Sequence, residues 1–431
     1  MTTRREFMVG VSGLTFGILL EGCAATPEAR ERGGASLAQT PAGGARTVNA
    51  WASLSPDGTI WIVNPAVEMG QGSQTAIPLI IAEEMDADWS RVVIVPAAPD
   101  DKVYGNPGFR GLMYTAGSAT VTGYWDVART FGAQVRRVMM ENAARLWNVP
   151  LAELSTEPST VVHAKSGRRL GYGEIAAVAQ LPAVAPAIKP EELKQPGQYR
   201  LIGKDVMRVE LPSKVDGSAQ YSIDVQLPGM LYGAVLRGPV EGSAPLAIDD
   251  SRSRAIPGVV SIVRMSFGVG VIAETPWAAF GAKDALEVTW DRRARAFGHD
   301  SARAPALYSA AARDLTRPGK PWDSAGDAPA AMQKAAKIYE AEYICDYTYH
   351  AQMEPLNSVA SVSAAGDACE IWCGTQSQTM AVAAVAKALG IAPEKVKLNL
   401  MLLGGASAGA GTATRSSSSI PCCCRRKSSG R

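Results

Sequence analysis

The amino-acid sequence predicts an α+β fold made of several mixed modules. Two strand-like runs flank Asp57-Gly58, a dipeptide that is typical of a tight hairpin turn. Apolar residues with a helical period fill the range 126–147, among them Val127, Val138 and Leu146. The range 199–291 has the Val- and Gly-rich composition of short strands. We find no internal repeat.

The composition is that of a folded protein with two or three domains. The 431 residues are 47% hydrophobic and 19% charged, and their formal net charge is +2. Because this charge is small and no basic stripe is interleaved with aromatic residues, we expect no nucleic-acid partner. The seven cysteines form neither a disulfide framework nor a CxxC pair, and there are only three histidines, so a His/Cys metal site is not expected.

Residues 1–30 are interpreted as an export signal. Arg4 and Arg5 precede a short apolar run, which is the pattern of the twin-arginine pathway for proteins exported in the folded state. The alternative is an ordinary basic N-terminus before a core helix. The run is too short to span a bilayer, but Leu20-Glu21-Gly22-Cys23 is similar to a lipobox and leaves lipid attachment open. We therefore expect a periplasmic protein, with membrane association as an open alternative.

Changes in composition divide the rest of the chain into modules and linkers. The first module should contain the hairpin, a glycine-rich loop, a helix with Pro78 in its first turn, a strand and the long helix from 126. The third should contain one clear helix, "SQTMAVAAVAKALG". The expected segments are a linker at 31–47, a first module at 48–180, a second linker at 181–198, a strand-rich module at 199–295, a third module at 320–405 and an aberrant tail at 406–431.

The stretch "EMGQGSQT" places Gly70, Gln71 and Gly72 between a strand and the start of a helix. Small residues let backbone N–H groups approach an anion, and the helix N-terminus adds the positive end of its dipole. A phosphate or pyrophosphate would suit this loop. The stretch is neither GxGxxG nor a P-loop, however, so a structural turn is an equal alternative.

A second small, hydroxyl-rich stretch, "YTAGSATVTGYW", also precedes a helix. Ser118, Ala119 and Thr120 could supply further hydroxyl and backbone contacts to the same ligand. The alternative for this stretch is a helix cap with a tight turn. Two such loops in one module indicate a large anionic cofactor.

Four stretches of this chain, taken in order, resemble one protein family. They are "VEMGQGSQTAIPLIIAEEMDADW", "YTAGSATVTGYWD", "IGKDVMRVELPSKVDGSAQYSIDVQLPGMLYGAVLR" and "YHAQMEPLNSVASV" with the following "CEIWCGTQSQTMAVAAVAKALG". The chain resembles, from about residue 48 to 405, the molybdenum-binding large subunit of the xanthine dehydrogenase/aldehyde oxidase superfamily. The branch it resembles is that of the isoquinoline 1-oxidoreductase beta subunit and related periplasmic aldehyde dehydrogenases.

The resemblance implies a molybdenum centre on molybdopterin, in the cytosine dinucleotide form, with the metal held by the pterin and not by the protein. Gln376 matches the glutamine that approaches the oxo ligand of the molybdenum in the family. The residues that match cofactor-binding loops are Gly70, Gln71, Gly72, Ser118, Ala119, Thr120, Gln376, Gly404 and Gly405. No catalytic residue is assigned, because the family's glutamate base lies near the end of the full-length subunit.

The resemblance also implies the reaction and the partners. The substrate would be an aldehyde or an N-heterocycle, oxidised at an electron-poor carbon. Electrons would pass to a separate small 2Fe-2S subunit, which agrees with the lack of cluster-type cysteine spacing in this sequence, and a c-type cytochrome is a further candidate partner. The "LPGMLYG" stretch belongs to the family's a/b hammerhead domain and is expected to be a scaffold. We expect His350 and Glu354, which match residues near the family's pocket, to be structural, with a catalytic role as the alternative. Glu174 in "GYGEI" is expected to lie in an ordinary loop before a helix and not to be catalytic.

The tail at 406–431 departs from the family's pattern. Family members continue after "LLGG" as a GGGFG-type loop, whereas this chain continues through Ala406 to three adjacent cysteines at 422–424. A one-base shift turns every cysteine codon into one for Leu, Met or Val, and one consistent solution begins "GFGRRGN". We therefore expect a frameshift after about residue 405, with an open alternative frame in the coding DNA; a disordered tail is the alternative. The truncated chain alone would be inactive, and a non-catalytic exported binding or scaffold protein is the second hypothesis.

Overall fold

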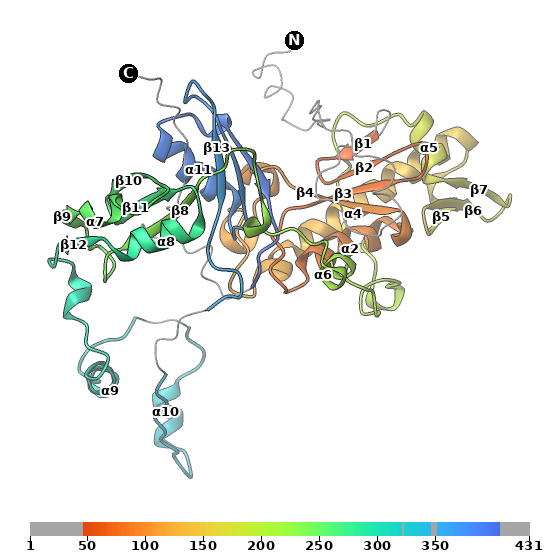
Figure 1. Ribbon diagram of the computed structural model, residues 1–431. Coiled ribbons are helices and arrows are strands. Elements are labelled where there is room, and N and C mark those ends of the chain that lie inside the picture. The colour runs from red at the N-terminus through yellow and green to blue at the C-terminus, as the bar shows by residue number, and fades with distance from the viewer. Residues whose placement is uncertain (1–45, 321–322, 346–350, 406–431) are drawn as a thin grey trace. The chain divides into compact units, whose positions relative to one another are not determined.

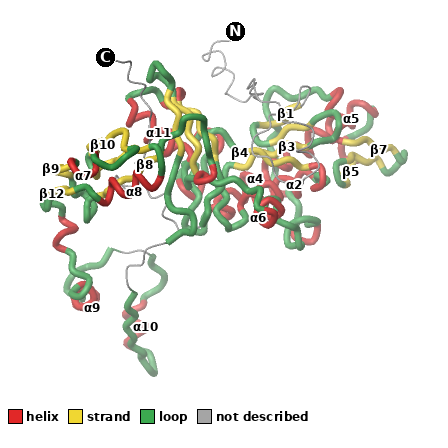
Figure 2. The backbone as a smooth tube through the Cα atoms, viewed as in Figure 1, coloured by secondary structure: helices red, strands yellow, loops and turns green. Residues whose placement is uncertain are grey.

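The computed structural model describes residues 46–320, 323–345 and 351–405 (Figure 1). The described residues form two compact units, one from residues 46–230 together with 351–405, and one from the described part of 231–345. Each unit mixes helices with sheets, which confirms the predicted α+β fold (Figure 2). Among the described residues, no helix combines the length and the apolar character needed to cross a membrane. The predicted signal at 1–30 and the predicted tail at 406–431 lie outside the described residues.

A four-stranded sheet begins the first unit. Its strands, in spatial order, are β1 (Arg46–Asn49), β2 (Ala52–Leu54), β3 (Ile60–Asn64) and β4 (Val92–Pro96). The pairs β1–β2 and β2–β3 are antiparallel, and β3–β4 is parallel. The predicted hairpin is confirmed, with Gly58 at φ 87° in the turn. A parallel pair needs a crossover connection, and the helix α2 (Ser73–Met85) provides it.

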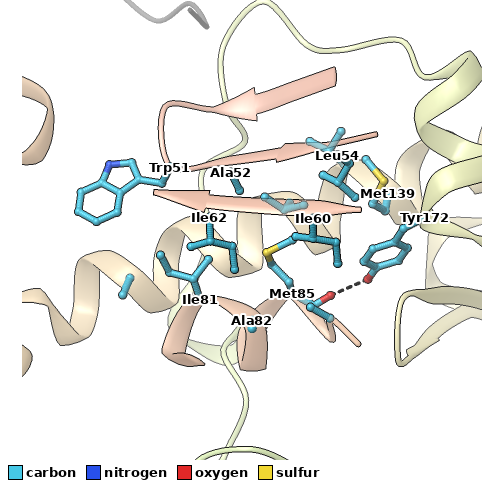
Figure 3. Close-up of a cluster of buried hydrophobic side chains, with 14 of the residues drawn as sticks. Trp51, Ala52, Leu54, Ile60, Ile62, Ile81, Ala82, Met85, Met139 and Tyr172 are labelled. Atoms are coloured by element: carbon cyan, nitrogen blue, oxygen red, sulfur yellow. Dashed lines mark hydrogen bonds between the residues drawn. The ribbon is translucent and has the colours of Figure 1, made fainter. Parts of the chain in front are cut away.

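The first core lies between this sheet, α2 and the long helix α4 (Thr120–Trp147). Figure 3 shows Ile60 and Ile62 of β3 pointing toward Ile81 and Met85 of α2. Met139 of α4 belongs to the same buried cluster. The hydroxyl of Tyr172 donates to the backbone oxygen of Met85 at 2.6 Å, so even the polar tip of this buried ring is satisfied. The helices approach closely at Gly132, where a Cβ atom would collide with the carbonyl oxygen of Ile81.

Both helices begin earlier than predicted. We expected Pro78 in the first turn of α2, but α2 begins at Ser73 and Pro78 lies in its interior, so that prediction is wrong. The helix can start there because the side chain of Glu68 accepts N–H groups at its first turn. Helix α4 begins at Thr120 instead of 126, and Leu146, which we placed on its apolar face, is exposed.

A second sheet of the first unit repeats this arrangement. Strands β13 (Val359–Val362) and β14 (Cys369–Cys373) pair antiparallel, α11 (Gln378–Leu389) crosses over, and β15 (Val396–Leu400) pairs parallel to β14. The order hairpin, helix, parallel strand is that of β2, β3, α2 and β4. Both helices also begin with Ser-Gln-Thr, at 73–75 and at 377–379 including the cap residue of α11. The tripeptide is too short to have shown as a repeat in the sequence.

The remaining elements complete the two units. In the first unit they are α3 (Asp101–Tyr104), β5 (Leu154–Glu157), β6 (Thr160–His163), β7 (Arg168–Gly171), α5 (Tyr172–Val178) and α6 (Leu211–Asp216), besides short 3₁₀ turns. In the second unit they are β8 (Tyr232–Arg237), β9 (Pro245–Asp249), α7 (Ser251–Arg254), β10 (Val259–Met265), β11 (Gly268–Ala273), α8 (Pro276–Asp284), β12 (Glu287–Trp290), α9 (Ala304–Arg313) and α10 (Ala328–Gln333). Strands were predicted over 199–291, but residues 199–230, all described, contain α6 and no named strand, so that part of the prediction is wrong.

Buried charges anchor the predicted linker at 181–198 to α2. The ammonium of Lys194, only 7% exposed, donates to Glu83 (Nζ–Oε1 2.8 Å) and to Asp86. Glu83 also accepts the backbone N–H groups of Leu201 and Ile202. Burial raises the pKa of Glu83, but the bonds from Lys194 and these two N–H groups outweigh it, so the pKa lies below its ordinary value. The linker is thus part of the folded unit.

Candidate functional site

The candidate site lies where the loop before α2 meets the loop before α11, each at the carboxyl end of a strand with a parallel partner. The side chain of Gln376 donates to the carbonyl oxygen of Thr115 (Nε2–O 2.7 Å), and the N–H of Thr115 donates back to the carbonyl oxygen of Gln376 at 2.9 Å. Gln378 donates to the carbonyl oxygen of Pro65 at 2.9 Å. These bonds join the first module to the third and close the junction between the two loops.

A pocket of about 370 Å³, part of it open to solvent, lies at this junction. Three residues of the predicted cofactor site, Gln376, Gly404 and Gly405, line it together with Met69. The N–H of Gly404 donates to a carboxylate oxygen of Glu354 at 2.8 Å, and the N–H of Glu354 donates to the carbonyl oxygen of Gly404 at 2.9 Å. The structure therefore brings Gln376 and the two glycines to one pocket, and cofactor binding by these residues stays a prediction.

Two amide oxygens in the pocket wall have no hydrogen-bond partner among the described residues. They are Oε1 of Gln376, a residue that is only 1% exposed, and Oε1 of Gln352. An unpaired buried acceptor costs about 1–3 kcal/mol, so such atoms usually mark a bound water or ligand. The edge of a planar heterocycle such as a pterin carries N–H donors that these oxygens would accept. The pocket residues therefore fit the group that the resemblance implies.

The glycine loop of the prediction is held by an internal carboxylate. Glu68, only 4% exposed, accepts the N–H groups of Gly70 (2.7 Å), Gly72 (3.1 Å) and Gln74 (3.0 Å). The amide of Gln71 turns back on its own loop and bonds Met69, Val67 and Ser73. Gly70 and Gly72 have φ of 105° and 85°, which explains the need for glycine at both positions. Cofactor contact by Gly70, Gln71 and Gly72 stays a prediction.

The second predicted loop forms the start of α4. Ser118 is exposed with φ 56°, the N–H of Ala119 donates to the carbonyl oxygen of Ala116 at 3.1 Å, and Thr120 is the first buried residue of the helix. None of these three residues, all of them described, lines the pocket. The loop is connected to the site through Thr115, whose hydroxyl accepts the N–H of Val67 at 3.1 Å. A cofactor contact by this loop also stays a prediction.

Two glutamates that we expected to be structural make hydrogen bonds to backbone N–H groups, and one of them, Glu354, also lines the pocket. Glu354 holds the Gly404 loop as described and also accepts the N–H of Ile223 at 3.2 Å. Glu174 accepts the N–H of Gly171 at 2.7 Å and so caps the first turn of α5. His350 lies outside the described residues. Within those residues, no group of three or more His, Cys, Asp or Glu side chains is placed to hold a metal ion.

Sequence reasoning missed Glu68, Thr115 and Gln352. A signal existed for Glu68, because an acidic side chain shortly before a helix start favours the N-terminal N–H groups and the dipole. The local sequence held no signal for Thr115, since its partner Gln376 is 261 positions away.

Comparison with known proteins identifies the family of the chain. A molybdopterin cofactor-binding domain family matches residues 4–222, and a second one with the same description matches residues 313–413. The first match alone covers more than half of the chain. The protein therefore belongs to the molybdopterin cofactor-binding family of the xanthine dehydrogenase superfamily, which confirms the predicted resemblance.

Its relatives define the branch. The chain is 37% identical to the beta subunit of isoquinoline 1-oxidoreductase from Brevundimonas diminuta, over 92% of this chain and 54% of that protein. It is 32% identical to a membrane-bound aldehyde dehydrogenase [pyrroloquinoline-quinone] of Gluconacetobacter polyoxogenes (83% and 46%) and 29% identical to a nicotinate dehydrogenase subunit of Pseudomonas putida (83% and 30%). The chain thus spans about half or less of the length of these relatives. A solved quinoline 2-oxidoreductase aligns with a TM-score of 0.36 and 18% identity over 47% of this chain and 30% of the other, which is too weak to add to the assignment.

Proposed function

We propose that the chain forms the large subunit of a molybdenum hydroxylase that oxidises an aldehyde or an N-heterocycle at an electron-poor carbon. The observation that carries the proposal is the pocket beside the Gly404–Gly405 loop, where the amide oxygen of buried Gln376 has no hydrogen-bond partner among the described residues. The names of the relatives support the substrate class. Isoquinoline and nicotinate are N-heterocycles, and the relative from Gluconacetobacter polyoxogenes is an aldehyde dehydrogenase. In all of these substrates the reacting carbon is polarised by an adjacent nitrogen or oxygen.

The proposed cofactor is molybdenum–molybdopterin in its cytosine dinucleotide form. When bound, it would supply the two-electron redox chemistry that amino-acid side chains lack. Gln376 and Gln352 would orient it by accepting hydrogen bonds with their amide oxygens, which accept none from the described part of the chain. Glu354 would keep the Gly404 loop against it, through the two bonds described above.

We also propose the finer features that the resemblance implies. Electrons would leave through a separate small 2Fe-2S subunit, with a c-type cytochrome as a further partner, and the protein would reach the periplasm by the twin-arginine pathway. The family's glutamate base is expected beyond residue 405, so the 431 residues alone would not turn over. A non-catalytic exported binding or scaffold protein is the alternative, and molybdenum content distinguishes the two.

The test is to express the chain with a 2Fe-2S subunit in a host that makes the cytosine dinucleotide cofactor, and to measure molybdenum and pterin in the purified protein. We expect close to one molybdenum per chain. We expect reduction of a dye by benzaldehyde or isoquinoline only in a second version of the protein, whose reading frame is restored after codon 405. Gln376→Leu should lose most of the molybdenum, whereas the matched exposed control Gln333→Leu should keep it. A folded chain without molybdenum would refute the proposal and favour the scaffold alternative.

A further inference from the structure

The loop before α2 already contains an anion of its own. Both carboxylate oxygens of Glu68 are used: one accepts the N–H groups of Gly70 and Gly72, and the other accepts that of Gln74. The N-terminus of the 13-residue α2 adds roughly half a positive charge at the same place. These are the contacts that a bound phosphate makes at a helix N-terminus. We propose that Glu68 is the resident anion of this loop and a positioning residue for the pocket, so the loop is filled and not open to a phosphate.

Basic residues in and just before the "SKVDG" segment, residues 213–217, lie close to Glu68 and its loop. The ammonium of Lys214 lies 4.0 Å from Oε1 of Glu68 and 3.7 Å from Oε1 of the buried Glu210. Arg208 donates to the carbonyl oxygen of Gly70 at 2.8 Å and lies 3.7 Å from Glu210. The charges of these two carboxylates and two basic groups sum to zero. A phosphate added to this cluster would therefore make it net negative and would lie beside two carboxylates that are themselves buried.

The position of Glu68 links its carboxylate to the pocket wall. Its backbone oxygen accepts the N–H of Leu403 at 3.1 Å, immediately before the Gly404–Gly405 loop, and the next residue, Met69, lines the pocket. A loop that lost its carboxylate would thus release two parts of the wall together. The inference goes beyond the proposed function, because it depends on the loop and its charges and not on which group the pocket binds.

The test is chemical rescue of Glu68→Ala in the absence of any cofactor. Removing the carboxylate leaves three N–H groups without an acceptor, and we expect the Tm of the variant to fall by about 4 °C or more. Formate should raise the Tm of Glu68→Ala toward the wild-type value and leave the wild type unchanged, with chloride at equal ionic strength as the control. Glu68→Gln, which fills the space without a charge, should be destabilised but not rescued. The matched control Glu174→Ala removes an exposed helix-capping carboxylate and should not respond to formate.

Binding of inorganic phosphate gives a second readout. The wild type should show no saturable binding in equilibrium dialysis, and Glu68→Ala should bind phosphate. If Glu68→Ala does not fold, amide hydrogen exchange is measured on Glu68→Gln instead. Relative to the wild type, we expect faster exchange over residues 69–74 and unchanged exchange in α11. Saturable phosphate binding to the wild type that is unaltered in the variant, or a folded Glu68→Ala that formate does not stabilise, would overturn the proposal. Molybdenum loading does not enter these experiments, so their failure is separate from a failure of the proposed function.

Discussion

Replacing Lys194 with methionine tests the buried charges that anchor the linker to α2. Methionine keeps most of the length of the side chain but removes the ammonium that bonds Glu83 and Asp86. Removing one partner of a buried ion pair costs about 3–5 kcal/mol, because the other charge stays buried without compensation. The exposed pair Lys397–Glu370, with Nζ–Oε1 at 2.6 Å and the lysine side chain 63% exposed, provides a matched control. We expect Lys397→Met to cost less than about 1 kcal/mol.

The pH dependence of the folding stability distinguishes the contribution of the Lys194 charge from the contribution of its packing. In the wild type the pKa of Glu83 lies below its ordinary value of 4.5, so its ionised form stabilises the folded state above that pH. This stabilisation is lost as the pH falls through the folded-state pKa. In Lys194→Met the burial of Glu83 is no longer offset by the ammonium, so its pKa rises. The difference in stability between wild type and variant should therefore be large at neutral pH and shrink below the ordinary pKa of a glutamate.

Urea denaturation followed by tryptophan fluorescence is a suitable assay, because Trp51 is buried in the first core. The free energies of unfolding of the wild type, Lys194→Met and Lys397→Met are compared at neutral and at acidic pH. Equal losses in the two variants at neutral pH would refute the reasoning. The reasoning would also be refuted if the difference in free energy of unfolding between the wild type and Lys194→Met did not decrease at acidic pH. The loss of stability would then come from packing and not from charge.

Two further predictions concern the cores and the thiols. Gly132→Ala should destabilise the first unit by about 1–3 kcal/mol in urea denaturation, because a Cβ there would lie 2.8 Å from the Cβ of Glu84 and closer still to a carbonyl oxygen. Gly281→Ala in α8 should instead be neutral or stabilising by up to about 1 kcal/mol, since the nearest atom would be 3.9 Å away; a loss as large as that of Gly132→Ala would contradict this. Burial raises the pKa of Cys373 to about 12, so iodoacetamide at mildly alkaline pH should modify the exposed Cys345 long before Cys373. Peptide mapping by mass spectrometry checks this order, and equal rates in the native protein would count against it.

Local patterns in the sequence were sufficient for elements that depend on their own residues. The hairpin at Asp57-Gly58 needs only its turn residues, and α11 is indicated by its own apolar period. The start of α2 was predicted too late in the chain, because its first N–H groups are accepted by Glu68, six positions before Gln74, and the signal of this acidic residue was not used. The repeated order of hairpin, helix and parallel strand could not be predicted either, because the two segments have almost no identical residues at equivalent positions.

The candidate site was predictable only in part for a similar reason. Gln376, Gly404 and Gly405 came from the resemblance to a family, and the structure places all three at one pocket. Their contacts with Thr115 and Glu354 follow from the tertiary fold, which no local pattern encodes. Glu68 lies within one of the stretches that resemble the family, but the resemblance predicts no role for its side chain.

The long sequence separation across the site has a consequence for the order of folding. The bonds from Gln376 to Thr115 and from Gln378 to Pro65 span 261 and 313 positions, and residues 231–350 form a separate compact unit within that interval. Contacts this distant form late, because the entropy of closing the loop must be lost before they contribute. We therefore expect a nascent chain to complete the first module while the third is still unsynthesised. During that wait the carboxylate of Glu68 would keep the N–H groups at the start of α2 satisfied, so the unfinished half of the pocket can stay folded until its partner arrives.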